Sequence, residues 1–424
     1  MKKYVSIFLT VVLAFGVLVG CGPKRDVQET KGDTGDADTG NVEKPEKLVI
    51  WVNDDEKQKQ AMTDIINKYM EKTGIDVEVV GVSMLEQTQK LALDGPAGNG
   101  PDIFYQPHDR IGDIVLQGLA EPIDLGSVKD QYSETAINAV TFDGKYYGVP
   151  QVVETYGLFY NKDLVAKAPK TMDELMIIAK EHTNASQDKY GFLIEAANFY
   201  FVYPFFAGYG GYVFSKTDGK YDTNDIGLAN EGAVKGGQLI QSWFKEGYVP
   251  KEVTPDIMNG LFTEGKVATV ITGPWNIAPY RDALGDKLAT APLPLLDNGE
   301  HPKSFVGVKT WMLSSFSDNK EWAIDLMKFI TNTENAMYYY EKAGEMPANK
   351  EALESEKIVN DPLIAGFAEQ IQYGEPMPSV PQMSQVWDPM GNALQFIAKG
   401  DDPKQVLEEA VEAIQNNIAA SGAQ

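Results

Sequence analysis

The chain alternates between apolar runs of strand length and stretches with helical spacing, and this alternation restricts it to an α/β fold. Residues 48–52 form a continuous apolar run, the pattern of a strand buried on both faces. Apolar side chains then recur at helical spacing over residues 61–70, and Gly74 follows as a stop signal. Residues 75–79 alternate as a second strand. The strand–helix–strand order predicts a parallel sheet covered by helices on both faces.

The same pattern continues over more residues than one hydrophobic core usually holds. Further strands are predicted at residues 102–105, 146–150, 158–160, 267–271 and 306–313. Helices are predicted at residues 172–180, 231–244 and 322–330, and a last one follows a cap at Asp402 with Pro403 in its first turn. Because single cores rarely grow beyond about 250–300 residues, two domains are expected from residue 47 onward.

The first twenty residues have the composition of an export signal. Lys2 and Lys3 precede an apolar run at residues 5–19, which is too short to span a bilayer comfortably. The run ends at Leu18-Val19-Gly20 directly before Cys21, the only cysteine. Residues 1–20 are therefore predicted to be a signal peptide, and no other segment is long and apolar enough to span a membrane.

Cys21 has two interpretations. A lone cysteine is often a buried, inert thiol, but this one stands in the Leu-x-Gly-Cys arrangement that bacterial lipoprotein signals resemble. Acylation with chains such as palmitate would anchor the protein on the outer face of the cell membrane, since two chains suffice for stable anchoring. Residues 21–46 are polar and are predicted to be a disordered tether that carries the lipidated Cys21.

The composition excludes several kinds of partner. A formal net charge of −24 repels phosphate backbones, so no nucleic acid is expected to bind. Three histidines and one cysteine leave no His/Cys metal site, and residues 222–225 lack the twelve-residue calcium-loop pattern. Residues 95–101 are glycine-rich but lack the Gly-Lys-Ser/Thr ending of a phosphate loop. Neither a metal nor a cofactor is predicted.

Polar turns follow three of the predicted strands. They lie at residues 53–55, 106–110 and 273–275. Ligands of open α/β sheets bind outside the carboxyl ends of the strands, so these turns are the candidate binding site.

Seven short motifs occur along the chain in a particular order. They are Leu48-Val49-Ile50-Trp51-Val52-Asn53, Gly100-Pro101-Asp102-Ile103, His108-Asp109-Arg110, Tyr160-Asn161-Lys162-Asp163, Gly273-Pro274-Trp275, Phe305-Val306-Gly307-Val308 and Pro381-Gln382-Met383-Ser384. In this order the chain, from about Lys47 to the C-terminus, resembles the maltose/maltodextrin-binding proteins of bacterial ABC importers. His-Asp-Arg, Gly-Pro-Trp and Pro-Gln-Met-Ser together make the resemblance specific.

The resemblance implies a two-lobed periplasmic-binding-protein-like fold of type II, with hinged lobes and a ligand cleft between them. The first lobe is expected to comprise residues 47–153 and 305–360, and the second residues 154–304 and 361–424. It also implies a monomer that performs no chemistry, binds maltose and maltodextrins and delivers them to the permease subunits of an ABC transporter. Whether the dextrin is linear or cyclic (a cyclodextrin) stays open at the level of the sequence.

The polar residues after the first and third strands have two interpretations. By their types alone, Asp55, Asp109 and Arg110 suit a solvated turn and a helix cap. The resemblance implies that both aspartates accept hydrogen bonds from sugar hydroxyls and that Arg110 donates to them.

Other expected site residues come from the middle and the end of the chain. The resemblance implies that Glu154 is a hinge-proximal carboxylate, that Tyr200 and Tyr203 reach the cleft, and that Trp275 and Trp387 are stacking platforms for glucose rings. The alternatives are a surface glutamate on an edge strand and aromatic rings buried in the core.

The chain departs from the family pattern at several of these places. Gln106 stands where the family often has an aromatic platform, and it is also expected to bind sugar. Glu56 replaces a common lysine, with Lys57 one position later, while Asn198 and Asp388 replace an acidic residue and a tyrosine.

Two other functions are compatible with the same residues. Carboxylates and tryptophans in one cleft would suit a secreted glycoside hydrolase acting on α-glucans, which needs a pair of Asp or Glu residues. A cell-surface adhesin or sensor for starch would use the same site.

Overall fold

The computed structural model describes residues 43–217 and 220–421, all of which lie in the unit Ala37–Gln424. The predicted signal peptide, Cys21 and most of the predicted tether lie outside the described residues. Within the described ranges, no helix combines the length and the apolar character needed to cross a bilayer.

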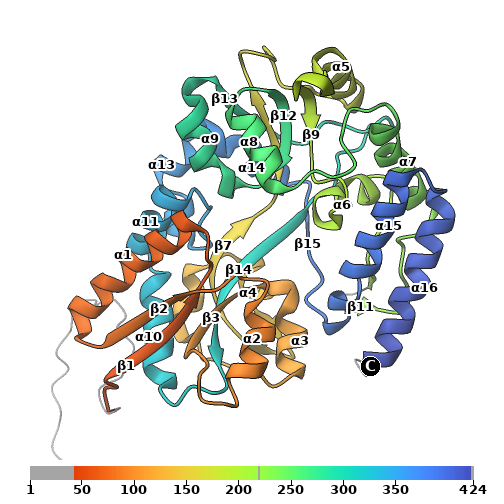
Figure 1. Ribbon diagram of the computed structural model, residues 1–424. Helices are drawn as coiled ribbons and strands as arrows, with labels where there is room; N and C mark the ends of the chain where they lie inside the picture. Colours follow the sequence, from red (N-terminus) through yellow and green to blue (C-terminus); the bar gives the residue numbers. More distant parts are fainter. Residues whose placement is uncertain (1–42, 218–219, 422–424) are drawn as a thin grey trace, which may run out of the picture. The chain divides into compact units, whose positions relative to one another are not determined.

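The first lobe is built on a seven-stranded mixed sheet (Figure 1). Its central order is β15-β14-β3-β1-β2, and β4 and β7 also pair with β14. The strands are β1 (Lys47–Val52), β2 (Asp76–Gly81), β3 (Ile103–Pro107), β4 (Ala120–Glu121), β7 (Val149–Glu154), β14 (Phe305–Ser314) and β15 (Glu375–Pro376). β1 runs parallel to β2 and β3, which confirms the predicted parallel strand–helix–strand unit.

Helices cover both faces of this sheet. Successive side chains of β1 point to opposite faces, and both sets are apolar and need to be buried. Leu48, Ile50 and Val52 pack in one cluster with α1, α10 and α11, whereas Trp51 packs on the other face with α2 and α3. The helices of this lobe are α1 (Glu56–Thr73), α2 (Gln87–Asp94), α3 (Ile111–Leu116), α4 (Glu134–Ala139), α10 (Lys320–Ile330), α11 (Thr333–Ala343), α12 (Lys350–Leu353) and α13 (Glu356–Val359).

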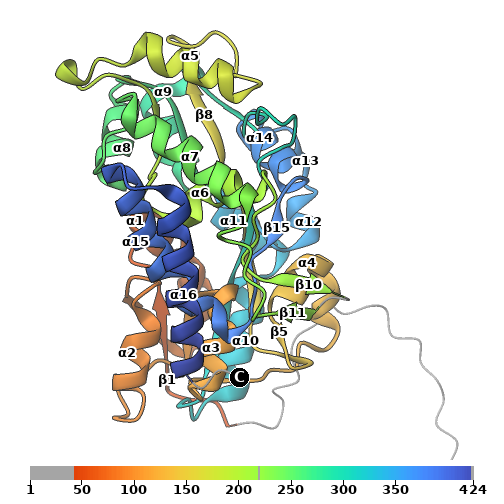
Figure 2. The same cartoon turned by 90° about the vertical axis from the view of Figure 1, so that its right-hand side faces the viewer.

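The second lobe is built on a four-stranded sheet of order β13-β8-β12-β9. The strands are β8 (Gly157–Asn161), β9 (Tyr190–Leu193), β12 (Val267–Thr272) and β13 (Leu288–Ala291). Its helices are α5 (Met172–His182), α6 (Phe199–Ala207), α7 (Glu231–Lys245), α8 (Pro255–Thr263), α9 (Ile277–Leu284), α14 (Pro362–Ile371), α15 (Trp387–Lys399) and α16 (Pro403–Ser421). α15 and α16 lie side by side and pack on α7 (Figure 2).

Two short hairpins complete the set of strands. β5 (Thr141–Phe142) pairs with β6 (Lys145–Tyr146), and β10 (Ser215–Thr217) pairs with β11 (Lys220–Asp222). The strand predicted at residues 146–150 is therefore divided between β6 and β7.

Two strands join the lobes. β7 leads into the second lobe and β14 returns from it, and the two pair antiparallel with Gly307 opposite Glu154. Figure 1 shows them side by side, rising from the first sheet toward the second lobe. Both lie close to the predicted crossings, but β15 (Glu375–Pro376) pairs with β14. A short part of the segment expected in the second lobe therefore belongs to the first sheet.

Trp243 on α7 is the largest side chain that is fully buried in the core of the second lobe, where it meets Phe192 and Phe205 edge-on at 5.4 and 5.0 Å between ring centroids. We expect Trp243→Ala to lower the free energy of unfolding by about 3–5 kcal/mol, because it removes buried area and leaves a cavity. Urea unfolding measures the change. Leu93→Ala, at a 71 % exposed position, is the control and should stay within about 0.5 kcal/mol. An equal loss in both variants would contradict this assignment of the core.

Candidate functional site

A cavity of about 520 Å³ lies between the two lobes at the ends of their strands. Its lining comes from the turns after β1 and β3, the joining strands, the start of α6, the turn after β12 and the start of α15. The lining residues are Asn53, Asp55, Gln58, Met84, Leu85, Pro107, Asp109, Arg110, Glu154, Asn198, Tyr200, Phe201, Trp275, Lys309, Met377 and Trp387. The cavity lies where the sequence predicted the binding site, outside the carboxyl ends of the strands.

Asp55 fills both roles that the sequence left open. Its Oδ1 accepts a hydrogen bond from the Gln58 backbone N–H at 3.0 Å, so it caps α1. It also lines the cavity. The cap therefore orients a carboxylate that belongs to the cavity wall.

The turn after β3 is held in place by His108. The buried imidazole lies 3.2 Å from the Met377 carbonyl through Nε2, and its Nδ1 accepts from the Val308 backbone N–H at 3.1 Å. Burial lowers the pKa of His108, because its charged form is poorly solvated there. The neutral ring therefore fixes the turn that presents Asp109 and Arg110.

Asp109 is a buried carboxylate that faces the cavity. Burial raises its pKa, although the neighbouring Arg110 guanidinium acts in the opposite direction. Trp387 begins α15 in the second lobe. Trp387 and Asp109 line the same cavity from opposite lobes, so an arrangement in which Trp387 lay far from Asp109 is excluded.

The second lobe contributes aromatic surfaces. Trp275 lies in the 3₁₀ turn η4 (Pro274–Asn276) directly after β12, and both it and Trp387 are only partly buried. A Cβ at Gly273 would lie 2.0 Å from the Trp275 ring, so only glycine lets this ring fold back over its own turn. Tyr200 on α6 also lines the cavity, and its hydroxyl is buried with no hydrogen-bond partner among the described residues.

The floor of the cavity carries a buried ion cluster on the joining strands. Lys309 Nζ lies 2.7 Å from Glu154 Oε2 and also pairs with Glu345. Burial by itself would lower the pKa of Lys309, but the two carboxylates outweigh it and raise this pKa. Lys309 was not predicted from the sequence. It is the only charged residue in the mostly apolar stretch 304–313, which is a signal that could have revealed it.

The structure brings seven of the nine predicted binding residues to the cavity wall, namely Asp55, Asp109, Arg110, Glu154, Tyr200, Trp275 and Trp387. Gln106 and Tyr203 are not among the lining residues. Gln106 is fully buried, where its Nε2 donates to the Met84 carbonyl at 2.5 Å and its Oε1 accepts from Thr88 at 3.1 Å. Tyr203 stacks on Phe305 at 3.8 Å and bonds through its hydroxyl to Glu375. Their polar groups are therefore used within the fold.

Lys57 does not line the cavity. Its Nζ forms an ion pair of 2.6 Å with Asp282 on α9, so it joins the start of α1 in the first lobe to a helix of the second. Both side chains are substantially exposed, and such pairs contribute about 0–1 kcal/mol.

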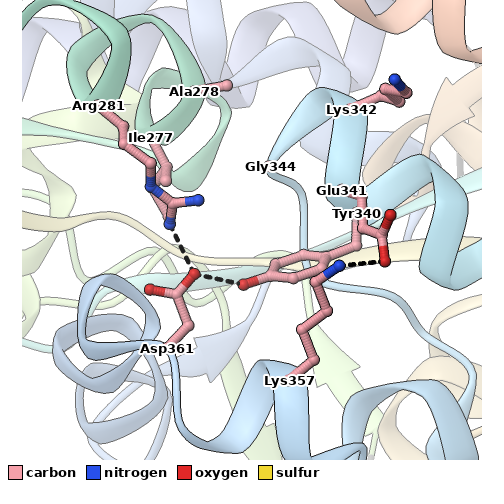
Figure 3. Close-up of a pocket in the computed structure, with 9 residues that line it drawn as sticks. All are labelled: Ile277, Ala278, Arg281, Tyr340, Glu341, Lys342, Gly344, Lys357 and Asp361. Carbon is pink, nitrogen blue, oxygen red and sulfur yellow. Dashed lines mark hydrogen bonds and ion pairs between the residues drawn. The ribbon is translucent and has the colours of Figure 1, made fainter. Parts of the chain in front are cut away.

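A second cavity of about 300 Å³ lies among α9, α11, α13 and the start of α14 (Figure 3). Its charged groups are mostly paired with one another. Asp361 accepts from Arg281 at 2.6 Å and from the Tyr340 hydroxyl at 2.8 Å, and Lys357 pairs with Glu341. With these donors and acceptors used, the larger cavity is the better candidate site.

Two α/β lobes joined by paired strands, with an aromatic and acidic cavity lined from both, define the class of two-lobed solute-binding proteins. A model of the bacterial extracellular solute-binding proteins matches residues 64–366. The chain belongs to this family. Members of the family are binding proteins, so the prediction that the chain performs no catalysis is confirmed.

Named relatives and solved structures agree with this family. The galactooligosaccharide-binding protein of Bacillus subtilis (strain 168) is 36% identical, over 99% of this chain and 98% of that protein. The maltodextrin-binding protein MdxE of the same organism is 34% identical over the same shares. A cyclo/maltodextrin-binding protein, solved with maltotetraose, has 44% identity and a TM-score of 0.77 over 89% of this chain and 98% of that one. The resemblance to maltodextrin-binding proteins is thus confirmed.

Because its pKa is raised, Asp109 is expected to make the free energy of unfolding depend on pH. The folded state holds a proton on Asp109 more tightly than the unfolded state, so stability is lost as pH rises from the ordinary carboxyl range through the raised pKa. Asp109→Asn removes this pH dependence, because asparagine does not titrate. In urea unfolding at a series of pH values, the stability of the wild type relative to Asp109→Asn should therefore fall as pH rises.

Asp163→Asn provides the matched control, because Asp163 is exposed and pairs with Lys287 on the surface. A difference between the wild type and Asp109→Asn that stays constant with pH would contradict the prediction.

Proposed function

We propose that the chain captures malto-oligosaccharides, including cyclodextrins, in the cavity between its lobes and delivers them to the permease of an ABC importer. The observation that carries the proposal is the pairing of two tryptophan platforms, Trp275 and Trp387, with the carboxylates of Asp55 and Asp109 on the opposite wall. Glucose rings present apolar C–H faces and a rim of hydroxyls. Aromatic faces match the former, and charged hydrogen-bond partners match the latter.

The energies of these contacts suffice for binding without chemistry. A hydrogen bond with a charged partner is worth roughly 1.5–3 kcal/mol, and stacking adds on the order of 1 kcal/mol. Asp55, Asp109, Arg110 and Glu154 supply the charged partners. A few of each, held in place before the ligand arrives, provide useful affinity.

Contacts from both lobes also support a closing motion. A ligand shifts a conformational equilibrium only if it binds one state better, and a sugar touching both walls does so for the closed form. Moving the population from 1:99 to 99:1 takes about 5.5 kcal/mol of preference. We propose that the closed, loaded form is the one that the permease subunits recognise.

The relatives support a sugar ligand and differ in its type. One is named for galactooligosaccharides, another for maltodextrins, and the solved neighbours include complexes with maltotetraose, maltose and maltopentaose. The two platforms favour the malto-oligosaccharides, whose successive glucose rings each offer a stacking face. Galactooligosaccharides are the comparison ligand in the experiment below.

We further propose that the mature chain is a monomeric lipoprotein, anchored through Cys21 on the extracytoplasmic face of the cell membrane. Two relatives from Streptococcus pneumoniae carry the name solute-binding lipoprotein, and the Leu-Val-Gly-Cys sequence before the polar tether supports the same processing here.

Titration calorimetry of the mature protein with glucose oligomers tests the proposal. We expect maltotriose or maltotetraose to bind with micromolar or better affinity and to change tryptophan emission, since two tryptophans line the cavity. Binding of galactooligosaccharides with no response to any glucose oligomer would overturn the choice of sugar.

Trp275→Ala should weaken maltotriose binding by about fivefold or more, because it removes one stacking surface worth on the order of 1 kcal/mol. Calorimetry measures the affinity, and thermal unfolding checks that the variant is folded. Trp322→Ala on α10 is the matched control, since Trp322 is absent from the cavity lining. Equal affinity in Trp275→Ala and wild type would count against this platform.

Prolonged incubation should leave maltotriose intact. Chromatography of the mixture measures the products, and the appearance of glucose or maltose would favour the glycoside hydrolase alternative. Heat-denatured protein is the control for spontaneous hydrolysis.

A further inference from the structure

Lys309 is a buried cation placed where the joining strands meet the cavity. Its side chain is 7 % exposed, and the carboxylates that pair with it, on Glu154 and Glu345, are 8 % and 0 % exposed. Removing three charged groups from water costs several kcal/mol per ion, and their attraction offsets this cost only with good geometry. Such a cluster calls for an explanation beyond stability.

The two carboxylates have different surroundings. Glu345 lies behind the cavity wall, where its Oε2 accepts from the Tyr339 hydroxyl at 2.9 Å. Glu154 lines the cavity, and its buried Oε2 faces Lys309 Nζ at 2.7 Å, whereas its Oε1 takes part in no hydrogen bond among the described residues. Glu154 therefore keeps capacity to accept a hydrogen bond from a bound hydroxyl.

Lys309 also touches the second lobe. Its Nζ lies 5.0 Å from the centroid of the Trp275 ring, within the range of a cation–π contact. The turn that carries Trp275 packs against Gly344, the residue before Glu345. The packing is close, because a Cβ added at Gly344 would lie 3.4 Å from the Pro274 carbonyl oxygen. One cation thus contacts a hydrogen-bond acceptor on one wall and a stacking platform on the other.

We propose that Lys309 is a positioning residue of the sugar cleft: it favours the ionised form of Glu154, orients this carboxylate at the cavity wall and holds Trp275 beside it. This inference rests on the proposed function and adds a residue to it. Lys309 acts through its two neighbours, so its loss changes how binding depends on pH as well as how tight it is.

The sign of the pH effect follows from the charges around Glu154. Burial raises the pKa of Glu154, Lys309 lowers it, and Glu345 raises it again. Besides Glu154 and Glu345 themselves, the titratable groups that face this cluster are Asp109, Tyr105, Tyr200 and Tyr339. Without Lys309, Glu154 takes up a proton at higher pH, because its cation is gone and the like charge of Glu345 remains.

The test measures maltotriose affinity by calorimetry from pH 5 to pH 9 for wild type, Lys309→Met and Lys309→Met/Glu345→Gln. In Lys309→Met, affinity should fall at least tenfold at neutral pH, and the pH at which affinity is half lost should move upward. Adding Glu345→Gln should move that pH back toward the wild-type value. Lys287→Met, which removes a surface lysine from an ion pair with Asp163, should match wild type throughout.

Glu345→Gln alone keeps the cation and provides a second route if Lys309→Met does not fold. It removes the like charge, so the pH of half-lost affinity should move downward. A pH profile of Lys309→Met, or of Glu345→Gln, that superimposes on the wild-type profile would overturn the proposal. Wild-type protein that binds no maltotriose would instead refute the proposed function, so the two failures are distinguishable.

Discussion

The antiparallel pairing of β7 with β14 is the constraint on which the rest of the structure depends. These strands belong to the sheet of the first lobe, and their ends carry the chain into and out of the second. The pairing places Gly307 opposite Glu154, where a Cβ would lie 3.1 Å from the Glu154 Cγ. The close fit leaves room for the glutamate side chain at the cavity floor and sets it next to Lys309 on β14.

The cavity combines two kinds of wall with different physical roles. The first lobe offers carboxylates whose positions are set by local structure. Asp55 is fixed because it caps α1, and Asp109 is fixed because the neighbouring His108 is buried and hydrogen-bonded. The second lobe offers large aromatic faces on short turns and helix starts. Because binding energy comes from both walls at once, a ligand favours the conformation in which they approach each other.

Buried charge explains why function and stability oppose each other at this site. Asp109 and Glu154 are both removed from water, and burial raises the pKa of each. A fold selected only for stability would replace them by apolar groups, since buried ion pairs often contribute little net stability. Their retention at a cavity wall is consistent with the recognition of a hydroxyl-rich, uncharged ligand.

The sequence alone determined the α/β class, most strand and helix positions and seven residues of the cavity wall. Apolar periodicity, polar turns at strand ends and spaced motifs are local signals that can be recognised in the sequence alone. Tertiary structure decided the rest. Gln106 and Tyr203 are fully bonded inside the fold, Lys57 reaches Asp282 on α9, and Lys309 joins Glu154 to Glu345. Each of these depends on partners 18 to 225 positions away along the chain, and a one-dimensional pattern carries no record of which distant group a side chain meets.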